Sequence, residues 1–305
     1  MSKKLREFDL IARIRQTTGD SDDRVPIGPG DDMALVNLDR SQVLLSVDQL
    51  VAGRHYDPQT TPLAAVGRKA ITRSLSDIAA MAAQPAGCVA GAVLPRDMAE
   101  AEVDSLFRAM RDAAAEFDCP LVGGDISIWE GPLVLNVTVS ASPTTRGVVR
   151  RSGARPGDLV GVTGKLGGSL VSGRHLTFRP RIAEALALHG ALGEHLHAMI
   201  DLSDGLGRDA GHLAAEGHVS LILDADRLPL HPGCDWCQGL GDGEDYELCF
   251  TTDAAPDLIS QLEIGVAIAV VGEVRERTPS SPLVAVRHPD GRLEPAQDVG
   301  WEHGA

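Results

Sequence analysis

The chain has 305 residues, enough for two domains of ordinary size that each bury a hydrophobic core. Hydrophobic residues make up 43% of it and charged residues 23%, a composition that excludes a disordered or collagen-like chain. Acidic residues outnumber basic ones by 43 to 28, and the net charge of -15 disfavours binding to nucleic acid. The apolar stretches are shorter than the ~20 residues of a membrane helix, and the N-terminus has no signal-peptide core. We therefore expect a cytoplasmic protein that does not bind membranes.

The first half of the chain alternates between helical and extended patterns. Apolar residues at helical spacing predict helices over 4–17, 62–83 and 99–117. Short apolar runs predict strands at 34–38, 43–47, 87–94 and 133–141. The polar segment 150–158, rich in Gly and Pro, predicts a boundary between an N-terminal domain (1–150) and a C-terminal domain (151–305).

The second half repeats the alternation. We expect strands at 159–163, 219–223, 247–251, 267–272 and 283–287, and a strand followed by a helix within 199–216. Aromatic residues are only 3% of the chain while glycines number 33, so the cores must be built from Ala, Val, Leu and Ile. This composition favours the α/β class in both halves.

Aspartates stand at predicted strand ends, in glycine turns and on one helix: Asp31, Asp32, Asp48, Asp77, Asp125, Asp201 and Asp204. Many carboxylates without a comparable set of His or Cys favour a hard divalent cation, because Mg²⁺ prefers oxygen ligands. In enzymes such an ion often accompanies a polyphosphate. The alternative for any single one is structural, since an aspartate at a turn or helix N-terminus also accepts hydrogen bonds from free backbone N–H groups.

A polyphosphate also needs hydrogen-bond donors, and the chain has no Walker motif, because Lys165 is followed by Leu166. Three other segments are candidates: the glycine-rich turn 164–169, a turn at 123–125, and the N-terminus of the helix that follows 201–205.

Two other patterns suggest metal or redox chemistry and are disfavoured. His231, Cys234 and Cys237 have zinc-like spacing, but no second pair follows, so a four-ligand site would be incomplete. His212, on the flank of a predicted helix, is more typical of a structural histidine. The five cysteines are an odd number scattered along the chain, and we expect reduced thiols.

Nine motifs follow one another along almost the whole chain: GPGDD (28–32), LSVDQLVAGRHY (45–56), LSDIAAMAAQP (75–85), VGGD (122–125), RRSGARPGD (150–158), TGKLGGS (163–169), MIDLSDGLGRDAGHL (199–213), GEDYELCFT (243–251) and GWEH (300–303). In order and spacing they resemble the thiamine-monophosphate kinase family. The resemblance implies the PurM-like fold of the superfamily that includes aminoimidazole ribonucleotide synthetase and selenophosphate synthetase. It also implies a homodimer joined through the N-terminal sheets and ATP in a cleft between the two domains.

The resemblance implies roles for the residues at matching positions. Several magnesium ions would be bound by Asp32, Ser46, Asp48, Asp77, Asp125, Asp201 and Asp204. ATP would contact Gly124, Asp125, Arg151 and Ser203, and thiamine monophosphate would contact His55, Glu244 and Trp301. Trp301 would stack on the flat cationic ring of this acceptor and Glu244 would attract it.

The implied reaction converts ATP and thiamine monophosphate into ADP and thiamine diphosphate. A phosphate monoester has a second pKa of ~6 and is largely deprotonated at neutral pH, so no general base is required. The reaction instead needs cations and in-line positioning of two polyanions. The lack of a Ser/His/Asp or Cys/His constellation agrees with this.

Several segments depart from the family pattern. Residues 123–132 read GGDISIWEGP, two residues longer than the usual GGDTTRGP, and lack its threonines and arginine. Val47 replaces a threonine that could have helped a magnesium site, Gly168 replaces an aspartate, and 172–179 and 229–243 look shorter than usual. Two alternatives therefore stay open: a superfamily phosphotransferase with another acceptor, and a catalytically weak protein that binds thiamine diphosphate or nucleotide.

Overall fold

A computed structural model describes residues 23–27, 30–39 and 41–302, so the helix predicted over 4–17 lies outside the described part of the chain. Among the described residues, no helix is long and apolar enough to cross a membrane. All five cysteines are free thiols, as expected.

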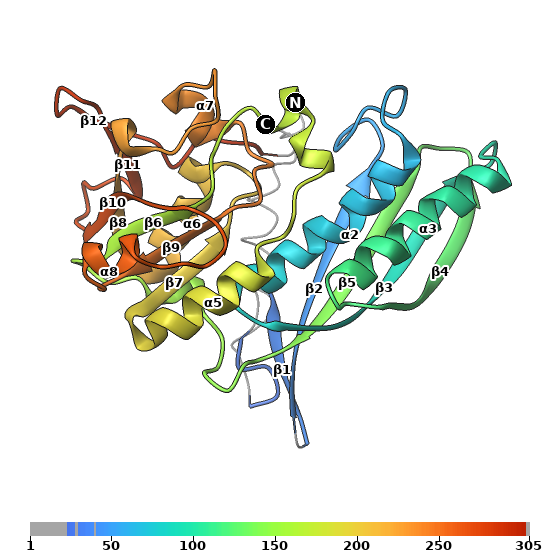
Figure 1. Ribbon diagram of the computed structural model, residues 1–305, viewed down its shortest axis with the longest axis horizontal. Helices are drawn as coiled ribbons and strands as arrows, with labels where there is room; N and C mark the ends of the chain where they lie inside the picture. Colours follow the sequence, from blue (N-terminus) through green and yellow to red (C-terminus); the bar gives the residue numbers. More distant parts are fainter. Residues whose placement is uncertain (1–22, 28–29, 40, 303–305) are drawn as a thin grey trace, which may run out of the picture.

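The first sheet has five strands in the order β1-β2-β5-β3-β4. Their bounds are β1 Ala34–Leu38, β2 Ser41–Val51, β3 Gln84–Pro95, β4 Leu121–Trp129 and β5 Val134–Ser142. Helices α2 (Leu63–Ala80) and α3 (Glu100–Glu116) cover one face of this sheet (Figure 1). The apolar stripe predicted for the first of these helices is confirmed, since Ile71, Leu75 and Ile78 are fully buried.

Strand β4 corrects the turn predicted at 123–125. It pairs in parallel with β3 at the edge of the sheet, and its residues from Val122 to Trp129 are exposed. Two adjacent glycines suggest a chain reversal, but here Gly124 serves close packing: a Cβ on it would lie 1.9 Å from the carbonyl oxygen of Ala90. The glycine pair therefore belongs to an extended strand.

The second sheet has seven strands in the order β12-β11-β8-β10-β6-β9-β7. Their bounds are β6 Leu159–Thr163, β7 Leu196–Asp201, β8 Val219–Asp224, β9 Leu248–Thr252, β10 Ile268–Glu276, β11 Val284–Arg287 and β12 Leu293–Pro295. The helices of this half are α4 Ser169–Ser172, α5 Ile182–Leu192, α6 Leu206–Gly217, α7 Trp236–Gly241 and α8 Pro256–Ser260. The predicted α/β class is confirmed in both halves.

One hydrophobic core joins the two sheets. Leu188 on α5, Met199 on β7 and Phe250 on β9 belong to the same buried cluster as Leu75 on α2. A second cluster lies on the opposite face of the second sheet, where Leu213 of α6 packs. Helix α2 thus lies between the two halves of the molecule (Figure 1), and its polar side chains can reach both. The predicted boundary at 150–158 falls between the sheets, while the division into domains 1–150 and 151–305 stays a prediction.

Candidate active site

Three of the predicted aspartates meet where the two halves adjoin. Asp32 precedes β1, Asp77 lies on α2 and Asp201 ends β7, and one carboxylate oxygen of each lies within 4.8 Å of the others. Oxygen ligands on opposite sides of one Mg²⁺ ion are about 4.2 Å apart, so a small inward movement would place these three on a common ion. We call Asp32, Asp77 and Asp201 the acid cluster.

Burial makes the acid cluster unfavourable without a cation. Desolvation raises the pKa of Asp201 to about 8, and the negative charge of Asp32 adds to the effect. Desolvation also raises the pKa of Asp77 well above its usual value, with Asp48 and Asp201 contributing next. Carboxyl groups that resist ionisation this strongly gain from a divalent cation between them.

Two hydroxyls orient these carboxylates. Ser46 donates a hydrogen bond from Oγ to Asp77, and Ser76 donates one from Oγ to Asp201 Oδ2 over 2.6 Å. Ser46 is a predicted site residue, whereas Ser76 is not, although it directly precedes Asp77. Both serines fix carboxylates that a metal would need in place.

Arg151 provides the acid cluster with a positive charge. Its Nε and Nη2 donate to the two oxygens of Asp32 over 2.8 and 2.6 Å, and the Asp32 side chain is fully buried. Burial would lower the pKa of Arg151, but the charges of Asp32 and Asp201 outweigh it and raise the pKa above its usual value. Arg73, which interacts with Asp48 and Asp77, adds a second guanidinium, so two cations face four carboxyl groups and the site is short of positive charge.

Strand β2 presents two further predicted residues towards α2. Ser46 and Asp48 pair with Val139 and Val137, which are buried beneath the helices, and Asp48 Oδ1 accepts a hydrogen bond from Arg73 Nη2 over 3.3 Å. Val47 is 57% exposed on the opposite face. The side chain at position 47 therefore points away from α2, because side chains alternate along a strand.

The structure does not bring Asp125 to the acid cluster of the same chain. The register aligns Asp48 with Val137, Ala90 and Gly124, so Asp125 lies in the next row and points to the other face. Three inter-strand spacings of about 4.8 Å separate β2 from β4. Gly124 and Asp125 therefore lie apart from the other predicted residues.

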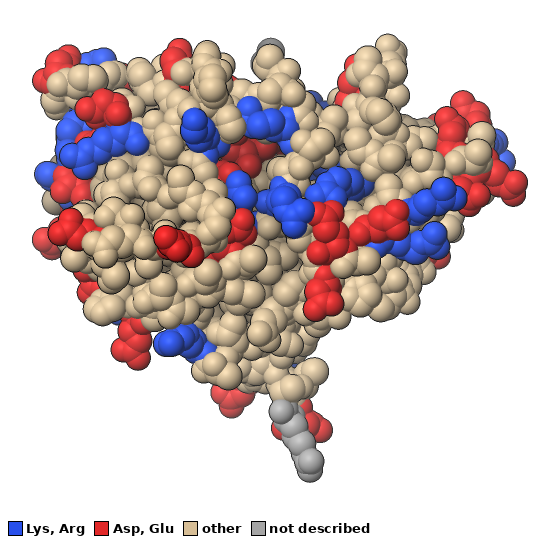
Figure 2. Space-filling model, in the orientation of Figure 1, with Lys and Arg blue, Asp and Glu red and all other residues tan. Residues whose placement is uncertain are grey.

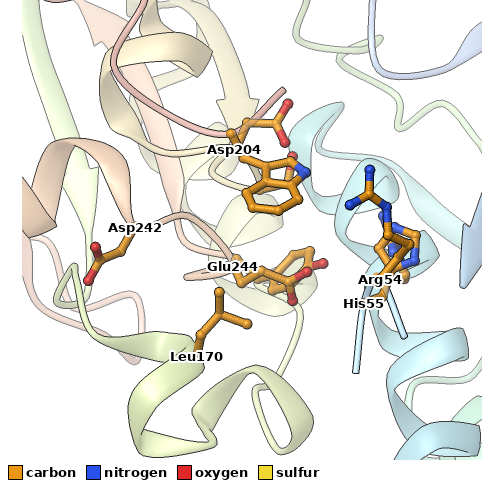
Figure 3. A pocket seen from close by; sticks show the side chains of 10 residues that line it. Arg54, His55, Leu170, Asp204, Asp242 and Glu244 are labelled. Atoms are coloured by element: carbon orange, nitrogen blue, oxygen red, sulfur yellow. The ribbon is translucent and has the colours of Figure 1, made fainter. Parts of the chain in front are cut away.

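The remaining predicted residues line one pocket beside the acid cluster. Its walls are formed by Arg54, His55, Arg73, Leu170, Ser203, Asp204, Asp242, Glu244, Tyr246 and Trp301. Figure 3 shows Glu244 on one side and Arg54 and His55 on the other. The cavity volume of the pocket is about 70 Å³. We call it the acceptor pocket.

The backbone around Glu244 is unusual. Gly243, Glu244 and Tyr246 all have positive φ angles, of 67°, 56° and 51°. The N–H of Glu244 donates to Ser203 O over 2.8 Å, and the N–H of Tyr246 donates to Leu202 O at the same distance. Non-glycine residues hold this conformation only where the surroundings impose it, and such positions cluster at functional sites.

Two of the predicted phosphate-binding segments have their N–H groups occupied. Gly167 and Gly168 donate to Asp245 Oδ2 and Asp242 Oδ2 over 2.9 and 2.8 Å. At the start of α6, the N–H groups of Asp204 and Gly205 both donate to Asp209 Oδ2 over 3.1 Å. The N–H groups of Gly167, Gly168, Asp204 and Gly205 are therefore engaged within the chain, and 123–125 lies in strand β4. The sequence alone did not show that nearby carboxylates accept hydrogen bonds from these N–H groups.

A second cavity lies on the other side of the segment that carries Glu244. Its lining includes Lys165, Arg174, Arg179, Arg181, Asp245 and Glu247, and Figure 2 shows basic side chains around an acidic hollow on this face. Arg181 pairs with Glu247, and Arg174 contacts Asp245 over 3.4 Å. These pairings engage both carboxylates, and the lining keeps more basic than acidic side chains.

Known proteins of similar sequence and structure identify the family of this chain. The family described as AIR synthase related protein, N-terminal domain, matches residues 30–142. A thiamine-monophosphate kinase of Salmonella typhimurium is 34% identical over 302 residues, which cover 88% of this chain and 90% of the relative. The chain belongs to the thiamine-monophosphate kinase family.

Solved structures support the assignment. The thiamine-monophosphate kinase from Stenotrophomonas maltophilia K279a matches with a TM-score of 0.73 at 31% identity, covering 96% of this chain and all (100%) of that one. The structure described as AaThiL complexed with AMPPCP and TMP matches with a TM-score of 0.79 at 27% identity, covering 99% of both chains. The family resemblance of the motifs and the PurM-like fold are confirmed.

Proposed function

We propose that this family member transfers the γ-phosphoryl group of ATP to thiamine monophosphate, giving ADP and thiamine diphosphate. The observation that carries this proposal is the adjacency of the acid cluster and the acceptor pocket. Arg73 joins them, since it lines the pocket and also donates to Asp48. A nucleotide held at the acids and an acceptor held in the pocket would meet at this arginine.

Magnesium fits the acid cluster because the donor set is all oxygen and short of positive charge. Asp32, Asp77 and Asp201 would hold it, and Ser46, Asp48 and Asp204 are proposed to complete the binding of several ions. Bound there, magnesium would neutralise the facing phosphates and favour in-line transfer. Arg151 and Ser203 are proposed to contact the nucleotide. Arg151 holds Asp32 in a fixed orientation through two hydrogen bonds.

The acceptor pocket offers the chemistry that thiamine monophosphate needs. Glu244 supplies a carboxylate and Trp301 an aromatic face for its cationic ring, while Arg54 and Arg73 supply guanidinium groups suited to its phosphate. His55 lies beside Arg54 on the wall opposite Glu244 (Figure 3). No proton needs to be removed from the attacking phosphate oxygen, so these residues bind and orient the acceptor.

We also propose a homodimer formed through the first sheet. The face opposite α2 and α3 exposes apolar side chains, among them Leu45, Val47 and Val89, at 39%, 57% and 42% exposure. Apolar residues grouped on an open sheet face favour burial against another surface. Asp125 lies on this face, so any role of Asp125 in binding nucleotide or metal would be exercised at the interface. Because ATP is the proposed substrate, we place the protein in the cytoplasm.

The decisive experiment measures ADP release from Mg·ATP with and without thiamine monophosphate, with thiamine diphosphate identified by mass. Product formed only with thiamine monophosphate supports the proposal. ADP release with other phosphorylated metabolites but not with thiamine monophosphate points to another acceptor. Nucleotide binding without any turnover points to a binding protein, and recovery of turnover after replacing 123–132 with GGDTTRGP would assign the defect to strand β4.

A further inference from the structure

Lys69 is a buried charge that the proposed chemistry does not use. It lies on α2 with its side chain fully buried, which is rare for a lysine and requires that its ammonium group be bonded. Arg73, one helical turn further along, donates to Asp48 beside the acid cluster. Arg73 thus contacts Asp48, whereas the partners of Lys69 lie in the walls of the acceptor pocket.

The Lys69 ammonium has three close partners. Nζ donates to the carbonyl oxygen of His55 over 2.8 Å, lies 2.8 Å from His175 Nδ1, and pairs with Glu244 Oε2 over 2.5 Å. His55 comes from the first half of the chain and Glu244 from the second. One ammonium group thus joins two opposite walls of the acceptor pocket.

His175 completes this arrangement as an acceptor. Desolvation and the neighbouring Lys69 both lower its pKa, which favours a neutral ring with a lone pair on Nδ1. Burial likewise lowers the pKa of Lys69, while the charge of Glu244 acts in the opposite direction. Three acceptor atoms thus lie within 2.8 Å of the Lys69 nitrogen, and a protonated amine has three N–H bonds.

The pairing also changes how Glu244 can act. Its side chain is 16% exposed at the pocket, and Oε2 is turned to Lys69. The positive φ of Glu244 makes the local backbone costly to hold, so an anchor on the carboxylate helps to keep the side chain in one position. Lys69 therefore fixes the position of the Glu244 carboxylate and at the same time neutralises its charge.

We propose that Lys69 is a positioning residue for the acceptor: it fixes Glu244 and the His55 peptide across the pocket and thereby sets acceptor affinity without affecting nucleotide affinity. The inference rests on the proposed function for its kinetic readout. Whether Lys69 holds together two segments from different halves of the chain can be tested without measuring turnover.

The test compares Lys69→Met with the wild type in the full-length protein. Methionine has a similar length and no donor. We expect KM for thiamine monophosphate to rise about tenfold, as for the loss of a charge-assisted hydrogen bond, with KM for ATP within about twofold of the wild type. Arg68→Met is the matched control, because Arg68 is the adjacent cation of α2 and pairs with Glu116 outside the pocket. It should leave both KM values unchanged.

The double variant Lys69→Met/Glu244→Gln tests the route of the effect. If Lys69 acts through Glu244, adding Lys69→Met to Glu244→Gln should raise the acceptor KM by less than it does in the wild type. Full additivity, equal increases in both KM values, or an unchanged acceptor KM in Lys69→Met would overturn the proposal.

Amide hydrogen exchange provides the readout that does not depend on turnover. In Lys69→Met, peptides covering 52–56 and 243–246 should exchange faster, while peptides of α6 exchange as in the wild type. Unchanged exchange in both segments would overturn the proposal even if the enzyme is active. If the wild type does not phosphorylate thiamine monophosphate, the proposed function fails, and the exchange data still decide whether Lys69 joins the two walls.

Discussion

The acid cluster and the acceptor pocket lie side by side and differ in how their buried charges are balanced. In the acid cluster, Asp32, Asp77 and Asp201 outnumber the guanidinium groups of Arg151 and Arg73, so negative charge is in excess. In the acceptor pocket, Lys69 balances Glu244 within the chain. An excess that the chain does not balance points to an external cation, whereas an internal balance points to positioning of a ligand. The predictions below test this difference.

The largest effect is expected for Asp201→Asn. Removing this carboxylate should lower kcat about a thousandfold, because a charge that holds the metal and orients the phosphates is lost. The free energy of unfolding, measured without divalent metal, should stay the same or rise, since repulsion among the buried acids is relieved.

Two measurements accompany this variant. Mg²⁺ should raise the melting temperature of the wild type more than that of Asp201→Asn. Asp253→Asn, which alters a surface carboxylate paired with His195, should behave as the wild type. A parallel loss of stability and activity in Asp201→Asn would mean that Asp201 is a structural acid, and the difference between the two regions would disappear.

Arg151→Lys sharpens the comparison by keeping the charge while removing the two-point contact with Asp32. Lysine cannot reproduce two parallel N–H bonds, so we expect kcat/KM for ATP to fall about tenfold. KM for thiamine monophosphate should change less than about twofold, and steady-state kinetics with each substrate varied in turn gives both values. Equal changes for both substrates would show that the acid cluster and the acceptor pocket do not act separately.

Much of this site could be predicted because its acids lie in short motifs that resemble a known family. The side chains that connect them were harder to find. Lys69, Arg73, Ser76 and Asp77 occur at spacings of i, i+4, i+7 and i+8 on α2, which is the repeat of one helix face. A polar stripe at that spacing usually indicates a solvated surface. Only the position of α2 between the two halves makes it the buried link of the site.

Prediction of the fold from the sequence was limited in the same way. Strongly periodic segments such as α2, α3 and β5 were predicted close to their observed bounds. Strand β4 was not, since an exposed edge strand carries no alternation of buried residues and its glycines resemble a turn. The consequence for the site is large, because the strand places Asp125 on the face opposite to the acid cluster, and only the pairing register reveals it.

Trp301→Leu tests the acceptor pocket with a smaller effect. Trp301 is 44% exposed at the pocket, so the loss of its aromatic face should raise KM for thiamine monophosphate about fivefold and leave KM for ATP unchanged. Trp301→Phe should retain most of the affinity, because a smaller aromatic face remains. If leucine and phenylalanine are equivalent, the indole contributes apolar contact alone and no cation–π attraction.

The last prediction concerns stability and tests whether the chain also balances the charge of Asp245, in the cavity behind Glu244. Desolvation raises the pKa of Asp245 to about 6 in the folded protein, against 3.8 as its ordinary value. The folded state then holds a proton that the unfolded chain has released, so the stabilisation present below about pH 4 is lost as the pH rises through about 6.

Asp245→Asn keeps the acceptor for the Gly167 N–H but cannot titrate. Between pH 4 and 7 the wild type should therefore lose roughly 2 to 3 kcal/mol relative to the variant in urea unfolding. A constant difference across this range would show that Arg174 and the Gly167 N–H already offset the burial of Asp245, as Lys69 does for Glu244.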